Sequence, residues 1–579
     1  MVARSWLGKL GWLHLVCRLL PTLGLLVLPY GPQPVAAQTS TQDKIAPSLQ
    51  AQMAANPAAL LPVIIEMAEA TVPFASSPNL QLAQQAVTIL QTNGQAVGAL
   101  PIINGAAGYA NTAGILAISL LPQVATIDQD SVVQPVRPSS TGPGWPPGQL
   151  GSLYTRETGA NRVWLQGGSG RGVTVAVLDS GVAADPDLTQ TSNRLLASAS
   201  FAGPRDALHP DPGGHGTHIA GTIAGDGARS SGQFVGMASH ANLVDVQVLD
   251  HNGHGRVSSV VRGIEWVLGH QAQYNIRAIN LSFGATAQGS YRQDPLAAAV
   301  QNAWKHGLVV VAAAGNSGPN SGSVVTPGVD PYAVTVGATD DQATLTLTDD
   351  LLAWFSAWGI PTDSTAKPDL VAPGRRIVSI RVPGSSLDTL LPSHVVTASN
   401  GSTYFRLTGT SMSTAVVSGA VALLLEHQPA LGPDQVKAIL TGTAQAFGQA
   451  AMPPPPGAAG AGLLDSFGAT NSTLRVAANQ GMRPADGFAR TLYPIMYGQP
   501  LAWKNPTYLG LNWAAQTWQT LNWAAPAWDN YVWDGVNWTN IAWDNIAWDQ
   551  TSWDNIAWDN IAWDNIAWDN IAWDSMGFD

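Results

Sequence analysis

Three short glycine-rich stretches constrain this chain more than any other feature. Residues 176–181, 214–218 and 409–413 each lie beside an apolar segment and carry, in that order, an aspartate, a histidine and a serine. A serine hydroxyl is a weak nucleophile, so a neighbouring imidazole must take its proton. The imidazole in turn needs a carboxylate that fixes its tautomer and stabilises its cation. Together the stretches predict a nucleophilic serine, although each alone is compatible with a turn aspartate or a surface histidine.

The flanking patterns predict where these residues lie. The valine-rich run over 172–178 has the length of a strand, which places Asp179 at its carboxyl end. Small residues after His215 predict a helix. The apolar run after Ser411 predicts a buried helix with the serine at its N-terminus, where N–H groups favour developing negative charge. Alternating strands and helices indicate an α/β fold with a parallel sheet, in which ligands bind at the carboxyl ends of the strands.

Residues 165–470 resemble the catalytic domain of the subtilisin-like (subtilase) serine proteases. The three stretches follow the Asp, His, Ser order of subtilisin. The resemblance is also carried by the segments 280–284, 309–318, 367–374 and 435–440. It implies a subtilisin-like parallel sheet with helices on both faces. It also implies a serine endopeptidase that hydrolyses proteins and peptides through an acyl-enzyme intermediate.

Two features depart from the family pattern. Residues 413–416 read Ser-Thr-Ala-Val, where most relatives have Ala-Thr-Pro-His. Losing the proline removes a fixed φ but introduces a better helix former, so we expect activity to survive. The stretch between Asn316 and Ser411 is longer than in compact relatives. We expect the surplus between 343 and 408 to form a surface loop or an added hairpin near the cleft.

The resemblance assigns roles to the residues of the centre. Ser411 is the nucleophile, His215 the general base, and Asp179 the carboxylate that orients the histidine. Asn316 is the oxyanion donor. Asparagine in Gly-Asn-Ser-Gly is also a natural turn residue, but in this context we favour the oxyanion role, which a subtilisin asparagine exemplifies. His218 is expected to be structural.

The resemblance also outlines the pocket for the side chain that precedes the cleaved bond. Its floor maps to Val325, where many relatives have glycine. A branched side chain there predicts a shallow pocket that favours Ala, Val or Leu over large aromatics. Its walls map to Ser282, Phe283, Gly284, Ala313, Ala314 and Gly315.

No cofactor is expected for catalysis. Asp187 matches a calcium ligand of the family, so a structural calcium stays open. Residues 225–233 lack the Asn-rich loop expected beside it, and we therefore expect at most weak calcium dependence. The net charge of -12 argues against a nucleic-acid partner.

The N-terminal part predicts secretion. Residues 1–37 combine basic residues, an apolar run over 19–28 and small residues at the end, which is typical of a signal peptide. This segment contains Cys17, the only cysteine of the chain. We therefore expect a mature protein without disulfides.

Residues 38–138 have a pattern of their own. Strands are expected at 63–67, 97–103 and 124–127, with helices at 80–90 and 113–121. This β-α-β-α-β order resembles the propeptide that folds subtilases and inhibits them, which implies a zymogen; an unrelated small domain is the alternative. The proline- and glycine-rich sequence within 139–164 predicts an exposed processing linker.

The C-terminal part is repetitive. After a linker over 471–502, the tail over 503–579 carries Trp every five residues, with Tyr508 in one of these places. The most regular form of the repeat is Trp-Asp-Asn-Ile-Ala. Neither a straight helix nor a flat strand keeps such residues on one side. A solenoid with one turn per pentad would do so, while a mobile low-complexity tail is the alternative. We expect cell-surface binding or self-association of the tail.

Two function classes follow. The first is a secreted or cell-surface serine endopeptidase made as a zymogen. The alternative is a surface-attached binding or adhesion protein that uses an inactive subtilase scaffold. The presence of Asp179, His215, Asn316 and Ser411 together favours the enzyme, because an inactive scaffold would be free to lose one of them.

Overall fold

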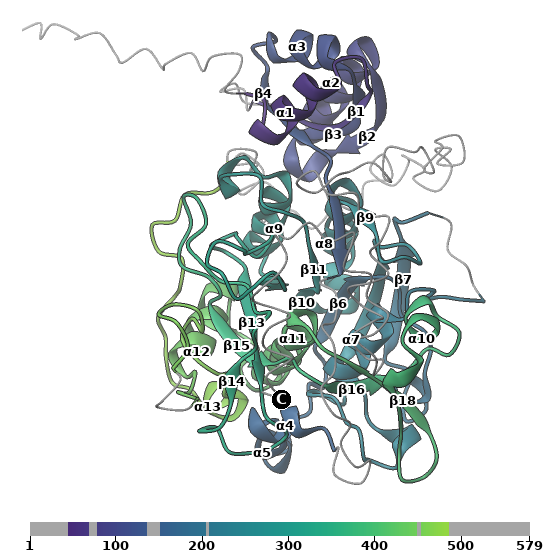
Figure 1. Ribbon diagram of the computed structural model, residues 1–579, viewed down its shortest axis with the longest axis vertical. Coiled ribbons are helices and arrows are strands. Elements are labelled where there is room, and N and C mark those ends of the chain that lie inside the picture. Colours follow the sequence, from purple (N-terminus) through teal and green to yellow (C-terminus); the bar gives the residue numbers. More distant parts are fainter. Residues whose placement is uncertain (1–43, 69–77, 136–150, 204–207, 449–452, 486–579) are drawn as a thin grey trace, which may run out of the picture. The chain divides into compact units, whose positions relative to one another are not determined.

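The computed structural model describes residues 44–68, 78–135, 151–203, 208–448 and 453–485 (Figure 1). The predicted signal peptide with Cys17, the first part of the processing linker and the tryptophan repeat lie outside these residues. Within the described ranges, no helix has both the length and the apolar character needed to cross a membrane.

An eight-stranded sheet forms the centre of the larger folded region, and all but one of its pairings are parallel. Strand β6 (Thr174–Asp179) is buried along its whole length, which explains why its sequence is a continuous apolar run. It ends at Asp179, as expected. The other strands are β7 (Leu195–Ser200), β8 (Asn242–Gln247), β10 (Ile276–Leu281), β12 (Val309–Ala313), β13 (Val334–Asp340), β14 (Leu351–Leu352) and β15 (Leu370–Pro373).

Helices cover both faces of this sheet. Adjacent residues of a strand point to opposite faces. Leu178 lies against Gly263 of α8, whereas Asp179 lies against Gly216 of α7. Because α11 packs on α7 and α9 packs on α8, the two pairs lie on opposite faces. The expected subtilisin-like α/β class is confirmed. These helices are α7 (His215–Ala224), α8 (Val257–Tyr274), α9 (Pro295–Lys305) and α11 (Thr410–His427).

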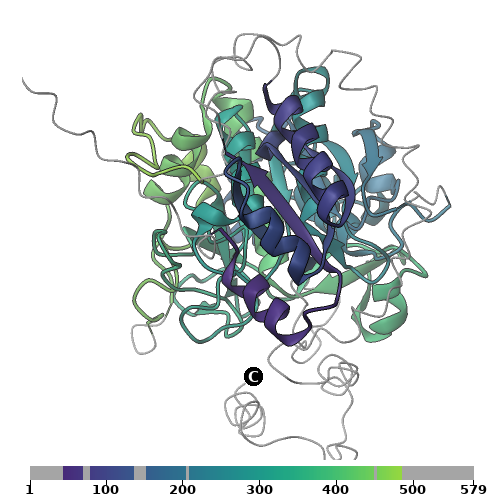
Figure 2. The same ribbon diagram turned by 90° about the horizontal axis from the view of Figure 1, so that it is seen from above.

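Residues 44–135 form a small α+β region with its own apolar core and an antiparallel sheet in the order β2-β3-β1-β4. Figure 2 shows this region in purple, with helices packed on the strands. The expected elements correspond to β1 (Leu61–Met67), α2 (Pro78–Asn93), β2 (Gln95–Leu100), α3 (Thr112–Ser119) and β4 (Val124–Gln129).

The sequence did not predict three elements of this region, namely α1 (Pro47–Ala55), β3 (Gly105–Ala110) and β5 (Val132–Pro135). Strand β3 is built of small residues and one tyrosine, without the β-branched residues typical of strands. It is a strand because it pairs with both β1 and β2. Backbone pairing on two sides overrides a weak local preference.

The surplus over 343–408 contains the added hairpin that the sequence led us to expect. Strands β16 (Ile377–Ile380), β18 (Thr403–Leu407) and β17 (Val395–Thr397) form an antiparallel sheet. A short helix, α10 (Ser386–Leu390), lies in the connection between β16 and β17. Strand β16 packs on α7, so the insertion contacts the helix that carries His215.

The structure describes parts of the two expected linkers. The expected linker over 139–164 contains α4 (Leu153–Glu157) and most of α5 (Ala160–Leu165), whose Tyr154 and Val163 are buried in the main core. The expected linker over 471–502 begins with described residues that pack on the domain, since the hydroxyl of Tyr291 donates to the carbonyl of Arg483 at 2.7 Å. The described parts of these segments, 151–164 and 471–485, lack strong periodicity, and tertiary contacts order them. The remaining helices are α6 (Pro186–Thr189), α12 (Pro433–Gly442) and α13 (Ser466–Thr470).

Candidate active site

Asp179 and His215 form a buried pair. Asp179 is the last residue of β6 and His215 the first of α7, so the sheet and the helix fix their backbones. Asp179 Oδ1 lies 2.8 Å from His215 Nδ1 and accepts a hydrogen bond from the N–H of Ser180 at 2.8 Å. Both side chains are almost completely buried. A carboxylate in this place holds the imidazole in one orientation and stabilises its cation.

Ser411 lies in the first turn of α11 and is fully buried. Its hydroxyl donates to the carbonyl of Ser282 at 2.8 Å, while the Ser282 hydroxyl donates to the carbonyl of Ser411 at 2.9 Å. Within the described residues, Nε2 of His215 has no hydrogen-bond partner. The structure therefore joins His215 to Asp179 and Ser411 to Ser282. Hydrogen bonds between nucleophile and base are often loose without substrate and tighten when it binds.

Asn316 lies beside the start of α11. Its Oδ1 accepts hydrogen bonds from the N–H of Thr410 at 2.9 Å and from the Thr410 hydroxyl at 2.8 Å. Because both hydrogen bonds are accepted by Oδ1, they fix the plane of the Asn316 amide, and Nδ2 is the donor group of that amide. The expected donor and the expected nucleophile, which follows Thr410, are thereby held close together.

The expected pocket residues also come together. Val325 lies between the two expected walls, because a Cβ on Gly284 would overlap its Cγ2 and a Cβ on Gly315 would lie 3.1 Å from its Cγ1. The N–H of Val325 donates to the carbonyl of Ala314 at 3.0 Å. Ser282, another of the expected wall residues, is fully buried. The valine side chain fills space that glycine would leave open.

A strand from the N-terminal region lies beside these walls, and the sequence did not reveal it. Strand β5 is the middle strand of the sheet β11-β5-β9, with β11 (Phe283–Gly284) and β9 (Gly255–Arg256) on its two sides. Pro135 pairs with Phe283 and Gln134 with Gly284. A short Val-Val pair before a proline is a weak strand signal, so pairing with both neighbours is what orders this segment.

The residues around Asp187 do not fit a calcium site. Its Oδ1 accepts from the N–H of Arg229 at 2.6 Å, and its Oδ2 accepts from the hydroxyl of Tyr404 at 2.6 Å. The guanidinium of Arg229 also pairs with Asp185 at 2.7 Å, and its positive charge acts on Asp187. Among the described residues, no group of three or more potential metal ligands is present.

His218 has the expected structural role. Its Nε2 lies 3.1 Å from each of the carbonyls of Ile377 and Phe405, in β16 and β18. Burial lowers the pKa of His218 to about 3, so the ring is neutral and donates to these acceptors. The second histidine of the motif thus binds the inserted hairpin to α7.

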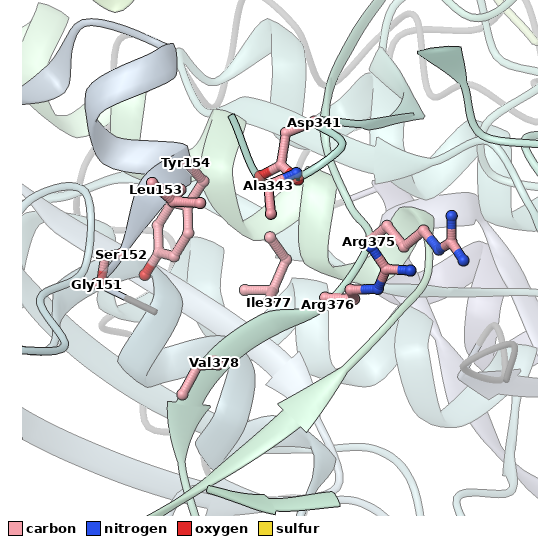
Figure 3. Close-up of a pocket in the computed structure, with 10 residues that line it drawn as sticks. All are labelled: Gly151, Ser152, Leu153, Tyr154, Asp341, Ala343, Arg375, Arg376, Ile377 and Val378. Carbon is pink, nitrogen blue, oxygen red and sulfur yellow. The ribbon is translucent and has the colours of Figure 1, made fainter. Parts of the chain in front are cut away.

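A small pocket is lined by a different set of residues (Figure 3). It contains none of the residues expected in the centre, and it is lined partly by the segment that leads into α4. Arg375, one of its lining residues, pairs with Asp340. Its lining residues are Gly151, Ser152, Leu153, Tyr154, Asp341, Ala343, Arg375, Arg376, Ile377 and Val378.

Comparisons with known proteins identify relatives of this chain. The model of the subtilase family matches residues 170–470, just over half of the chain. Serine protease AprX of Bacillus subtilis (strain 168) is 42% identical over 281 residues, which cover 47% of this chain and 61% of that protein. Subtilisin Savinase of Lederbergia lenta is 35% identical over 305 residues, which cover 53% of this chain and 93% of that protein.

Proposed function

Because this chain belongs to the subtilase family and carries a subtilisin-like serine protease domain, we propose that it is a secreted serine endopeptidase made as a zymogen. The observation that carries the proposal is the buried contact of 2.8 Å between Asp179 and the His215 ring. His215 is the first residue of α7, and α7 packs against α11. Ser411 in the first turn of α11 completes the set of groups that acyl transfer needs.

The proposed reaction starts with attack of Ser411 Oγ on the scissile carbonyl. Nε2 of His215 takes the hydroxyl proton and then gives it to the leaving amine, while Asp179 stabilises the imidazolium. The oxyanion that forms is held by the Nδ2 group of Asn316 and by the N–H of Ser411 at the N-terminus of α11. Water then attacks the acyl-enzyme carbonyl, His215 takes a proton from the water and gives it to Ser411 Oγ as the ester bond breaks, and the carboxylic acid product leaves.

The position of Val325 supports a preference for small and medium aliphatic side chains before the cleaved bond. Its branched side chain occupies the space between Gly284 and Gly315. A misfit of one methylene is worth about 1–3 kcal/mol, so the preference is graded. The substrates are proteins and peptides.

The N-terminal region is proposed to act as the inhibitor of the same cleft. Strand β5 supports this, because it takes the place of an extended chain between β9 and β11. Asp130 adds a contact: its carboxylate accepts from the N–H of Ser258 at 2.9 Å and from its hydroxyl at 2.7 Å, at the start of α8. The amide of Asn302 in α9 donates to the carbonyl of Ile102 at 2.8 Å.

The end of strand β5 supports a proposal for the bond that is cut during maturation. Pro135, the last described residue before the expected linker, opposes Phe283. Phe283 follows Ser282, whose carbonyl is hydrogen-bonded to Ser411. We therefore expect cleavage after Val136, a residue that suits the proposed pocket. Mass spectrometry of the secreted protein should find an N-terminus at Arg137.

The test of the proposed function is the Ser411→Ala variant. It should lose labelling by a fluorophosphonate probe, lose roughly 10⁶-fold in turnover and accumulate the precursor, by analogy with subtilisin. Equal casein cleavage by the variant and the parent protein would overturn the proposal. An adhesion protein on an inactive scaffold would show no labelling of either protein.

A further inference from the structure

Asp211 is the most highly connected carboxylate next to the candidate active site, and the reaction proposed above does not use it. It lies four residues before His215 and is 1% exposed. Its Oδ1 accepts hydrogen bonds from the N–H of Gly214 at 2.7 Å and from the hydroxyl of Ser180 at 2.8 Å. Its Oδ2 accepts from the N–H of Thr217 at 2.8 Å and from the Thr217 hydroxyl at 2.6 Å.

The two hydroxyl groups extend this network across the site. While Ser180 donates to Asp211, its Oγ accepts a hydrogen bond from the N–H of Gly216 at 3.0 Å. While Thr217 donates to Asp211, its Oγ1 accepts from the N–H of Ala183 at 2.9 Å. Each hydroxyl therefore connects the carboxylate to the opposite segment. Residues 180–183 follow Asp179, and residues 214–217 surround His215.

Close packing shows that the two segments have little freedom to shift. A Cβ on Gly216 would overlap the carbonyl of Gly181 and approach the Cβ of Asp179 to 3.0 Å. A Cβ on Gly213 would lie 2.9 Å from the Cβ of Ser180. Direct contact prevents the main chains from moving closer together, and the hydrogen bonds that cross between them limit movement apart.

A buried carboxylate is costly to retain in a folded protein. Burial raises the pKa of Asp211 even though its four hydrogen bonds act to lower it. Removing this carboxylate would leave four donors without their acceptor, which costs stability as well as local order. The geometry that these four donors define therefore explains why a charged group is kept at this buried position.

We propose that Asp211 is a positioning residue that fixes the distance and angle between Asp179 and His215 through Ser180, Gly214 and Thr217. It touches no reacting atom. This inference rests on the proposed function, because it concerns the geometry of the same acid and base. A shift of about 1 Å in a catalytic group can reduce a rate roughly 10²-fold.

The first test is Asp211→Asn, which keeps the shape of the side chain but replaces one acceptor oxygen by a donor. We expect kcat per titrated active site to fall roughly 10²-fold, with KM within about twofold, since transition-state geometry rather than substrate binding is disturbed. The rate of Ser411 modification by a fluorophosphonate should fall in parallel. Titrating active sites removes any contribution from unfolded protein.

The matched control is Asp434→Asn. Asp434 accepts hydrogen bonds from Trp304 and Asn479 at 2.9 Å each, in α12 and away from the network. A loss of stability alone would therefore lower the amount of active enzyme in both variants and leave kcat per site unchanged. Unchanged kcat in Asp211→Asn would overturn the inference.

Two further variants keep the inference testable if Asp211→Asn fails to fold. Ser180→Ala and Thr217→Val each remove one hydroxyl and one connection between the segments. Each should lower kcat per site by about tenfold without a matching rise in KM, and parent-like values for both would overturn the inference. If Ser411→Ala keeps the parent rate, the proposed function fails instead, which separates the two outcomes.

Discussion

Val325 shows how one side chain can set the selectivity of a site whose main chain is fixed. It is held between Gly284 and Gly315, and its N–H is bound to the carbonyl of Ala314. Gly315 has a φ of +115°, which residues with a side chain rarely adopt, so glycine is favoured at this wall. The volume available to a substrate therefore depends on the residue at position 325.

Val325→Gly should open the pocket. Removing the branched side chain frees space between the walls, so we expect the preference before the cleaved bond to move from Ala, Val and Leu towards Phe and Tyr. The change in the ratio of kcat/KM for a Phe peptide and an Ala peptide should be about 10-fold or more, since each methylene is worth about 1–3 kcal/mol. A peptide library measures this, and Val324→Ala, one residue away, is the control. An unchanged profile would reject the assignment of the floor.

At the scale of elements, the inserted hairpin contacts the turn that precedes His215. The N–H groups of Ser386 and Leu387 donate to the carbonyls of Pro212 and Gly213 at 2.9 and 3.1 Å. Arg381 holds the connection in shape through two hydrogen bonds to Asp388, at 2.6 and 3.0 Å. The insertion is thus an additional support for the helix that carries the histidine.

Arg381→Gln should loosen this support. The bidentate pair with Asp388 is lost, and a partly exposed pair of this kind is worth about 1 kcal/mol or less. We expect kcat/KM to fall by about two- to tenfold, with little change in the melting temperature. Steady-state kinetics measure the first and thermal melts the second. Arg475→Gln, at an exposed position whose side chain binds the carbonyl of Leu474, should behave like the parent.

Helix α4 carries a buried carboxyl group that interacts electrostatically with Asp350. Glu157 lies in α4, and Asp350 precedes β14. Within the described residues, none of the four oxygens of these two carboxyl groups has a hydrogen-bond partner. Burial, with repulsion from Asp341 adding to it, raises the pKa of Asp350 to about 7.

Asp350→Asn should therefore stabilise the domain at high pH. Between pH 4 and 7 the folded state keeps a proton that the unfolded state has lost, so the stability of the parent decreases as pH rises through this window. The neutral amide removes that penalty. We expect a higher melting temperature at pH 8, by roughly 2–4 °C for each kcal/mol regained, and no gain at pH 4. Asp363→Asn, at an exposed site, should show no pH-dependent difference.

For the molecule as a whole, the sequence predicted what local chemistry determines and missed what only pairing and packing determine. Asp179 at the end of an apolar strand and Ser411 at the start of an apolar helix were visible, because periodicity and glycine spacing mark them. The network around Asp211 was not, because hydroxyl partners such as Ser180 lie 31 residues away. Strand β3 has no strand signal in its own sequence, and it forms because it pairs with β1 and β2.

The first described residues of the expected linker over 471–502 pack on the catalytic domain. The carbonyls of Met482 and Arg483 accept from the hydroxyls of Tyr332 and Tyr291 at 3.0 and 2.7 Å. Ala485 is fully buried, and its N–H donates to Gln301 at 2.7 Å.

Truncation after residue 490 should therefore remove the tryptophan repeat and leave peptide hydrolysis and the melting temperature unchanged, because no group proposed for catalysis lies beyond that point. Truncation after residue 470 should lower the melting temperature by several degrees. It removes these three hydrogen bonds, each worth about 1 kcal/mol, together with the packing of Ala485. Thermal melts and hydrolysis of a small peptide by the two truncated proteins measure the difference. Loss of activity in the longer protein would show that the repeat belongs to the catalytic unit, and equal melting temperatures would show that residues 471–485 do not stabilise it.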